Sequence, residues 1–103
     1  MTASMVAGSF AGAGVSASYQ PITPFNPQRG FNLSIWGSFV ATIQLERSFD
    51  SGASWLPITA QGNQIYVFNG ACSEVIEEPE GGVLYRLNCT AFTSGAANYR
   101  IGQ

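Results

Sequence analysis

The stretch Phe39-Val40-Ala41-Thr42-Ile43-Gln44-Leu45-Glu46-Arg47-Ser48-Phe49 decides the fold class of this 103-residue chain. Its odd positions are mostly apolar and its even positions mostly polar, apart from Val40 and Arg47. This is the period of two of a half-buried β-strand, because successive side chains of a strand point to opposite faces. The stretch therefore predicts one long strand with its odd-numbered face in a core.

Shorter runs of the same kind lie on both sides of this stretch. We expect them to form further strands at residues 31–36, 55–59, 64–68, 72–77, 83–92 and 97–101. Pro57 has no N–H for a ladder, which places the strand 55–59 at a sheet edge, and Asn69-Gly70 favours a hairpin turn. No stretch has a helical period with caps. The chain is therefore predicted to be all-β, and six or seven short strands separated by turns favour a β-sandwich.

The corner before the strand 83–92 adds detail to this expectation. The run from Pro79 to Leu87 resembles the corner before the penultimate strand of immunoglobulin-like and fibronectin-type-III-like sandwiches, where a tyrosine hydroxyl bonds to upstream backbone. Tyr85 precedes Cys89 by four residues rather than two, which is closer to the fibronectin variant. We expect one small immunoglobulin- or fibronectin-III-like β-sandwich over residues 31–103.

Residues 1–30 differ from the rest of the chain. They are rich in glycine, alanine, serine and proline, and Arg29 is their single charge. Such a segment has too little apolar surface to offset the entropy of ordering itself. It is predicted to order against something else, either its own domain or a neighbouring subunit. We expect an extended N-terminal arm without regular secondary structure, ordered by contacts with other chains. Its aromatic residues Phe10, Tyr19 and Phe25 are the expected anchors of an assembly interface.

The composition narrows the function classes. The net charge is −2, lysine is absent and the four arginines are scattered, so the basic footprint of a nucleic-acid binder is missing. No apolar run is long enough to predict a membrane span. Without histidine or lysine there is no Ser-His-Asp triad, Cys-His pair or Schiff base, and we expect a protein that is not an enzyme.

No cofactor or metal is expected either. Glu74, Glu77, Glu78 and Glu80 are close together but lack the spacing of a calcium loop, and they are interpreted as a solvated strand end and turn. Cys72 and Cys89 are interpreted as small buried apolar residues, with a bridge between them left open.

The surface implied by the composition points to association. The chain is 46% apolar and only 10% charged, well below what soluble monomeric surfaces carry. Stable contact with other subunits, including copies of the same chain, would explain both values. A modestly soluble monomer is the alternative.

One motif is present. Ser48, Asp50, Gly52 and Trp55 match the Ser-x-Asp-x-Gly-x-x-Trp pattern called the Asp-box. We interpret it as a structural turn in which the aspartate bonds backbone amides and the tryptophan packs beneath. Trp55 and Tyr85 are accordingly predicted to be mostly buried, although Trp36 and Trp55 would also suit stacking on a sugar.

Residues 37–57 and 82–103 resemble small virion proteins of tailed bacteriophages and related gene-transfer particles. The shared pattern is a strand ending in Leu-Glu-Arg-Ser-Phe-Asp, then Gly and Trp, then a terminal Tyr-Arg hairpin. The resemblance implies a place in a virion assembled in the host bacterial cytoplasm, with the major capsid protein or other virion subunits as partners. The first hypothesis is a capsid decoration or cement protein. The alternative is a carbohydrate- or receptor-binding module of a tail fibre or spike, and a glycan-active enzyme ranks last.

Overall fold

The computed structural model describes residues 5–22 and 29–103, and within them every regular element is a β-strand. The all-β prediction is confirmed, and the predicted strands 31–36, 72–77, 83–92 and 97–101 each match an observed one closely. The strands are β1 (Met5–Phe10), β2 (Gly14–Val15), β3 (Phe31–Trp36), β4 (Phe39–Ser48), β5 (Leu56–Pro57), β6 (Thr59–Ala60), β7 (Asn63–Gln64), β8 (Val67–Phe68), β9 (Cys72–Ile76), β10 (Leu84–Gly95) and β11 (Ala97–Gly102).

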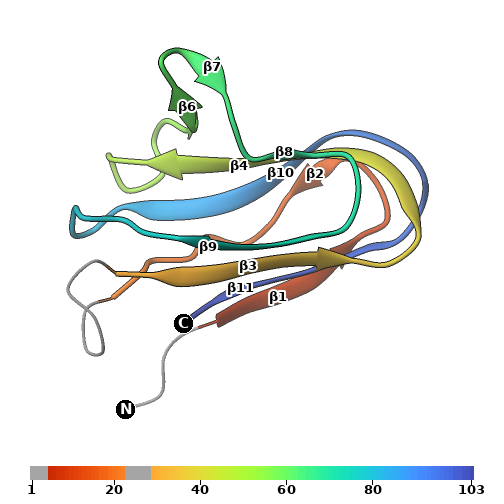
Figure 1. Ribbon diagram of the computed structural model, residues 1–103, viewed down its shortest axis with the longest axis horizontal. Coiled ribbons are helices and arrows are strands. Elements are labelled where there is room, and N and C mark those ends of the chain that lie inside the picture. Colours follow the sequence, from red (N-terminus) through yellow and green to blue (C-terminus); the bar gives the residue numbers. More distant parts are fainter. Residues whose placement is uncertain (1–4, 23–28) are drawn as a thin grey trace.

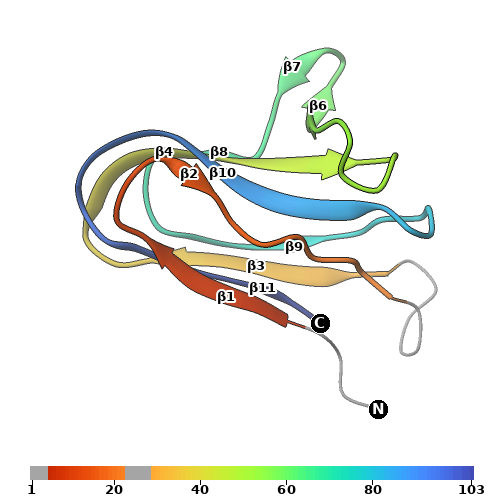
Figure 2. The same cartoon turned by 180° about the vertical axis from the view of Figure 1, so that it is seen from behind.

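Two antiparallel sheets share one core (Figures 1 and 2). The first has the order β1-β11-β3-β9 and the second the order β2-β10-β4-β5, with β8 also pairing with β4. Strands β6 and β7 form a small separate hairpin. The buried side chains of both sheets alternate with outward ones, as the period of two requires. They include Phe31, Leu33, Ile35, Ala41, Ile43, Leu45, Tyr85, Leu87, Cys89, Ala97, Tyr99 and Ile101.

The strand order is that of a jelly roll. From β1 to β4, and again from β8 to β11, each strand lies in the sheet opposite to that of its predecessor. The first and last of these strands, β1 and β11, are also neighbours in one sheet. Two packed sheets joined in this way are typical of the double-sheet jelly rolls. In an immunoglobulin-like sandwich the last two strands are neighbours in one sheet. Here β10 and β11 lie in different sheets, so the immunoglobulin- or fibronectin-III-like arrangement is wrong.

Two tight corners explain why consecutive strands change sheets. Gly37 and Ser38 alone separate β3 from β4, and Ala96 alone separates β10 from β11. The corners touch, because the Ala96 amide donates to the Ser38 carbonyl at 3.1 Å. Gly95 has a φ of 89°, and a Cβ there would lie 2.1 Å from the Ser38 oxygen. Only glycine fits this position.

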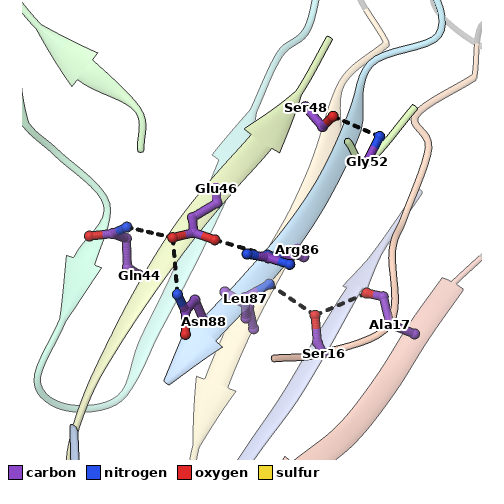
Figure 3. A network of polar contacts seen from close by, with 9 residues as sticks. All are labelled: Ser16, Ala17, Gln44, Glu46, Ser48, Gly52, Arg86, Leu87 and Asn88. Carbon is purple, nitrogen blue, oxygen red and sulfur yellow. Dashed lines mark hydrogen bonds and ion pairs between the residues drawn. The ribbon is translucent and has the colours of Figure 1, made fainter. Parts of the chain in front are cut away.

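The N-terminal segment belongs to the sheets, so the expected arm is wrong for residues 5–22. Strand β1 pairs with β11 along its whole length, with Met5 opposite Gly102 at one end and Phe10 opposite Ala97 at the other. Further along, Ser16 exchanges hydrogen bonds with Leu87, as Figure 3 shows in part, and the backbones of Tyr19 and Tyr85 pair. The domain therefore does not begin at residue 31.

Two of the three proposed aromatic anchors, Phe10 and Tyr19, are core residues rather than interface residues. Phe10 and Tyr19 are 6% and 2% exposed. Phe10 packs on Tyr99 with ring centroids 4.9 Å apart, and Tyr19 packs on Phe31 at 5.7 Å. Phe25 lies outside the described residues. The physical reason is that the neighbouring strands bury the few large side chains of a segment that is otherwise small and uncharged.

Two smaller expectations also need correction. Asn69 and Gly70 do not close a hairpin, because they lead from β8 in one sheet to β9 in the other. The alternation in the stretch 83–92 predicts one inward face made of Val83, Tyr85, Leu87, Cys89 and Ala91. In β10 this face ends at Cys89, since register shifts follow at Cys89/Ala91 and Phe92/Ser94. Such β-bulges exchange the two faces of a strand. Ala91 is therefore exposed, and Phe92 packs against the core.

Phe10→Ala tests the place of β1 in the core. We expect it to lower the free energy of unfolding by about 3–5 kcal/mol, as other buried phenylalanine truncations do. Met5→Ala is the matched control, since Met5 lies on the same strand but is exposed. Urea unfolding followed by circular dichroism measures both. Equal stabilities of the two variants would mean that the N-terminal segment is not a core strand.

Candidate functional site

The outer face of the β2-β10-β4 sheet carries the main polar constellation of the described residues (Figure 3). Strand pairing sets Val15 beside Asn88, Asn88 beside Gln44, and Gln44 beside Val67. The next row sets Arg86 beside Glu46. We call this surface the outer face; it comprises Val15, Gln44, Glu46, Trp55, Val67, Arg86 and Asn88.

Glu46 is at the centre of the outer face. Its carboxylate accepts hydrogen bonds from Arg86 Nε at 2.9 Å, Gln44 Nε2 at 2.8 Å and Asn88 Nδ2 at 3.1 Å. Although it lies on the outer side of the sheet, Glu46 is only 6% exposed. Its charge is therefore paired and its oxygens are satisfied without water.

Trp55 covers the positive partner of this carboxylate. The Arg86 guanidinium carbon lies 4.3 Å from the centre of the Trp55 ring, which is a cation–π contact. Trp55 is partly exposed, with most of its surface covered, which agrees with the prediction of a mostly buried side chain. Arg86 therefore contacts both the Trp55 ring and the Glu46 carboxylate.

The turn that carries Trp55 is closed by side-chain hydrogen bonds. The Gly52 amide donates to Ser48 Oγ at 2.8 Å, and Ser48 Oγ donates to Asp50 Oδ1 at 2.7 Å. Asp50 also accepts from the Ser54 amide at 2.9 Å and from the Ser54 hydroxyl. The hydrogen bonds from Ser54, first of all its hydroxyl, lower the pKa of Asp50 to about 2. The four Asp-box residues thus lie together in one turn.

A second polar cluster lies at the inner side of the same sheet. Glu78 is almost fully buried and accepts hydrogen bonds from the Tyr85 hydroxyl at 2.7 Å, from Arg47 Nη1 at 3.2 Å and from the Glu80 amide at 3.0 Å. Burial and the Glu78 contact raise the pKa of Tyr85. The prediction that Tyr85 is buried is confirmed, but its hydroxyl bonds a carboxylate rather than upstream backbone. The expectation that all four clustered glutamates are solvated is wrong for Glu78.

The two cysteines are free. Cys89 is buried and Cys72 is half-buried against the core, which confirms their role as small apolar residues without a bridge. Burial raises the pKa of both thiols, so they stay protonated at neutral pH.

The described part of the chain offers no metal site, pocket or membrane-spanning helix. It contains no cluster of three acidic, cysteine or histidine side chains placed to hold a metal, and no pocket. It also contains no helix of the length and apolarity that a bilayer span needs. Comparisons with protein-family models, with curated proteins and with solved structures returned no match.

Sequence reasoning missed Glu46 as the centre of a network. The signal was present, because Gln44 and Glu46 are two residues apart on one predicted strand, and Arg86 and Asn88 are two apart on another. Each pair therefore lies on one face of its strand. What the pattern lacked was the register that sets the two pairs opposite one another.

Asp50→Asn tests the turn through pH. Because the folded-state pKa is depressed, the ionised carboxylate stabilises the fold above about pH 4, and this contribution is lost between about pH 4 and pH 2. Asparagine has no such titration. Urea midpoints across this window should therefore fall more for the wild type than for Asp50→Asn, and parallel curves would contradict the described hydrogen bonds.

Glu46→Ala tests the network on the outer face. It leaves Arg86 and two side-chain amides without their acceptor, and we expect a loss of about 1–3 kcal/mol in the free energy of unfolding. Glu77→Ala is the control, because Glu77 is exposed, and surface changes of this kind alter stability by about 0.5 kcal/mol or less. If chemical denaturation finds the two variants alike, the network contributes nothing measurable.

Proposed function

We propose that the protein is a non-enzymatic structural protein of a tailed-bacteriophage virion, and specifically a capsid decoration or cement protein. The observation that carries the proposal is the amount of apolar surface left open. Among the described residues nine large apolar side chains are exposed, including Val15, Trp36, Leu56, Val67 and Val75. Monomeric soluble proteins keep contiguous apolar surface small, whereas subunits of an assembly cover it on association.

The fold supports the same proposal. Jelly rolls serve as viral capsid domains and as lectin domains, and a fold alone does not fix a function. The stretches that resemble virion proteins correspond to β4 with its following turn, and to β10 and β11. These elements build the core and the outer face, so the resemblance concerns the framework of the domain.

The outer face is the surface we propose to lie against the major capsid protein or another virion subunit. Covering a charge usually costs desolvation energy, but Glu46 is already desolvated and paired. Val15 and Val67 flank its network and supply apolar contact. Arginine and tryptophan, here Arg86 and Trp55, are the residue types that most often contribute binding energy at interfaces.

A carbohydrate- or receptor-binding module of a tail fibre or spike is the second candidate. Trp36 favours it, since this ring is half exposed on the outer side of the first sheet. Pairing places Asn98 beside Trp36, and Arg100 follows two residues further on the same face. An open indole next to amide and guanidinium donors suits stacking on a sugar ring with hydrogen bonds to its hydroxyls.

The copy number in purified particles distinguishes the two candidates. Counting by quantitative mass spectrometry should find hundreds of copies in each particle if the protein decorates the head. A few to dozens would point to a fibre or spike, and absence from particles would end the proposal.

The outer face is tested by incorporation into particles. We expect the double variant Val15→Lys with Val67→Lys to lose at least about tenfold in occupancy, because two buried charges would face the partner. Val75→Lys is the matched control, since Val75 is the most exposed large apolar residue described and lies on the other sheet. If both variants incorporate equally, the outer face is not the contact surface.

A further inference from the structure

The two sheets differ in how their edges are protected. A strand at a sheet edge presents unpaired N–H and C=O groups, and proteins limit unwanted pairing by short strands, proline, charge or cover. The first sheet ends at β1 and at β9, and the second at β2 and at the short strands β5 and β8.

Three of these edges are protected. Strands β2, β5 and β8 have two residues each, and β5 contains Pro57. Strand β9 has Glu74 at its middle, so self-pairing centred there would set Glu74 opposite Glu74. Like charges directly opposite each other destabilise a ladder.

Strand β1 has none of these protections. It has six residues, Met5–Phe10, without charge, proline or a break in its register with β11. Figures 1 and 2 show it at the outer limit of its sheet, and no described strand lies on its far side. It is the one long uncharged edge among the described residues.

We propose that β1 pairs antiparallel with β1 of a second copy of this chain. A two-fold axis would join two four-stranded sheets into one sheet of eight strands. The proposal concerns the protein by itself and does not rest on a role in virions. Because the contact uses the same strand on both sides, it is closed and stops at two copies.

The side chains of β1 fit a copy of themselves. A two-fold axis through Ala7 or through Gly8 sets inward residues of one copy opposite inward residues of the other, and outward opposite outward. Both cores therefore lie on the same side of the joined sheet. Ala7 then meets Ala7 or Ser9, and Gly8 meets Gly8 or Val6. These small side chains do not clash, and the pairing covers Met5, which is 55% exposed in the single chain.

Electrostatics permit this pairing. Among the described residues the charged side chain nearest to β1 along the sheet is Arg100, which lies opposite Ala7 on β11. With the axis at Ala7, the two copies of Arg100 would be three strand spacings apart, roughly 14 Å. This exceeds the screening length of about 8 Å at physiological salt, so their repulsion is weak.

Sedimentation equilibrium of the purified full chain tests the proposal. The wild type should approach twice the 10.9 kDa mass of one chain as its concentration rises. Ala7→Lys places a charge on the outward side of β1 in both copies and should weaken dimerisation at least tenfold. Val75→Lys, on the opposite edge strand of the same sheet, should dimerise like the wild type.

Any result other than these overturns the proposal. A monomeric wild type means that β1 does not self-associate, and a dimer that survives Ala7→Lys or is lost in Val75→Lys uses another surface. Circular dichroism checks folding, and Ser9→Lys replaces Ala7→Lys if the latter does not fold. Hydrogen exchange of the wild type gives an independent readout, since β1 amides should gain protection with concentration. Unchanged β1 protection in a dimer would equally overturn the proposal.

Discussion

The antiparallel ladder between β4 and β10 is the contact on which both sides of this molecule depend. On its inner side Leu45 faces Leu87 and Ile43 faces Cys89, all four of them fully buried or nearly so. On its outer side the same ladder sets Glu46 against Arg86. A slip of one residue would exchange the two faces, exposing the leucines and placing a carboxylate in the core. The core and the polar outer face therefore fix each other's register.

The elements with strong alternation were predictable from the sequence. Strands β3, β4, β10 and β11 all carry several apolar residues with a period of two. Strand β1 was not predictable, because Gly8 occupies one of its three inward positions. The need for glycine at this position is visible only in the folded structure, because a Cβ there would lie 2.7 Å from the Tyr99 hydroxyl. The small residues of β1, which do not suggest a strand in the sequence, are thus explained in part by the contact with Tyr99 on β11.

The polar sites also differ in how far apart in the sequence their residues lie. The Asp-box turn is local, and its hydrogen bonds join residues no more than four apart along the chain. Glu46 and Arg86 are forty residues apart, and Asn88, which also bonds Glu46, is forty-two residues from it. Glu78 is buried because Tyr85 and Arg47 reach it across a corner, which a run of glutamates in the sequence does not indicate. Spacing in sequence predicted the first kind of site and not the second.

The position of β11 has a consequence for how the chain can fold. This strand follows all the others in sequence, yet it lies inside its sheet, with β1 on one side and β3 on the other. On a ribosome, β1 and β3 would leave the exit tunnel long before the strand that joins them has been made. Until then β1 has no partner in its sheet, and β3 can pair only with β9. The first sheet therefore cannot be completed before β11 has been made, because β11 is the strand that joins β1 to β3. Such dependence on distant contacts is characteristic of slowly folding β-proteins.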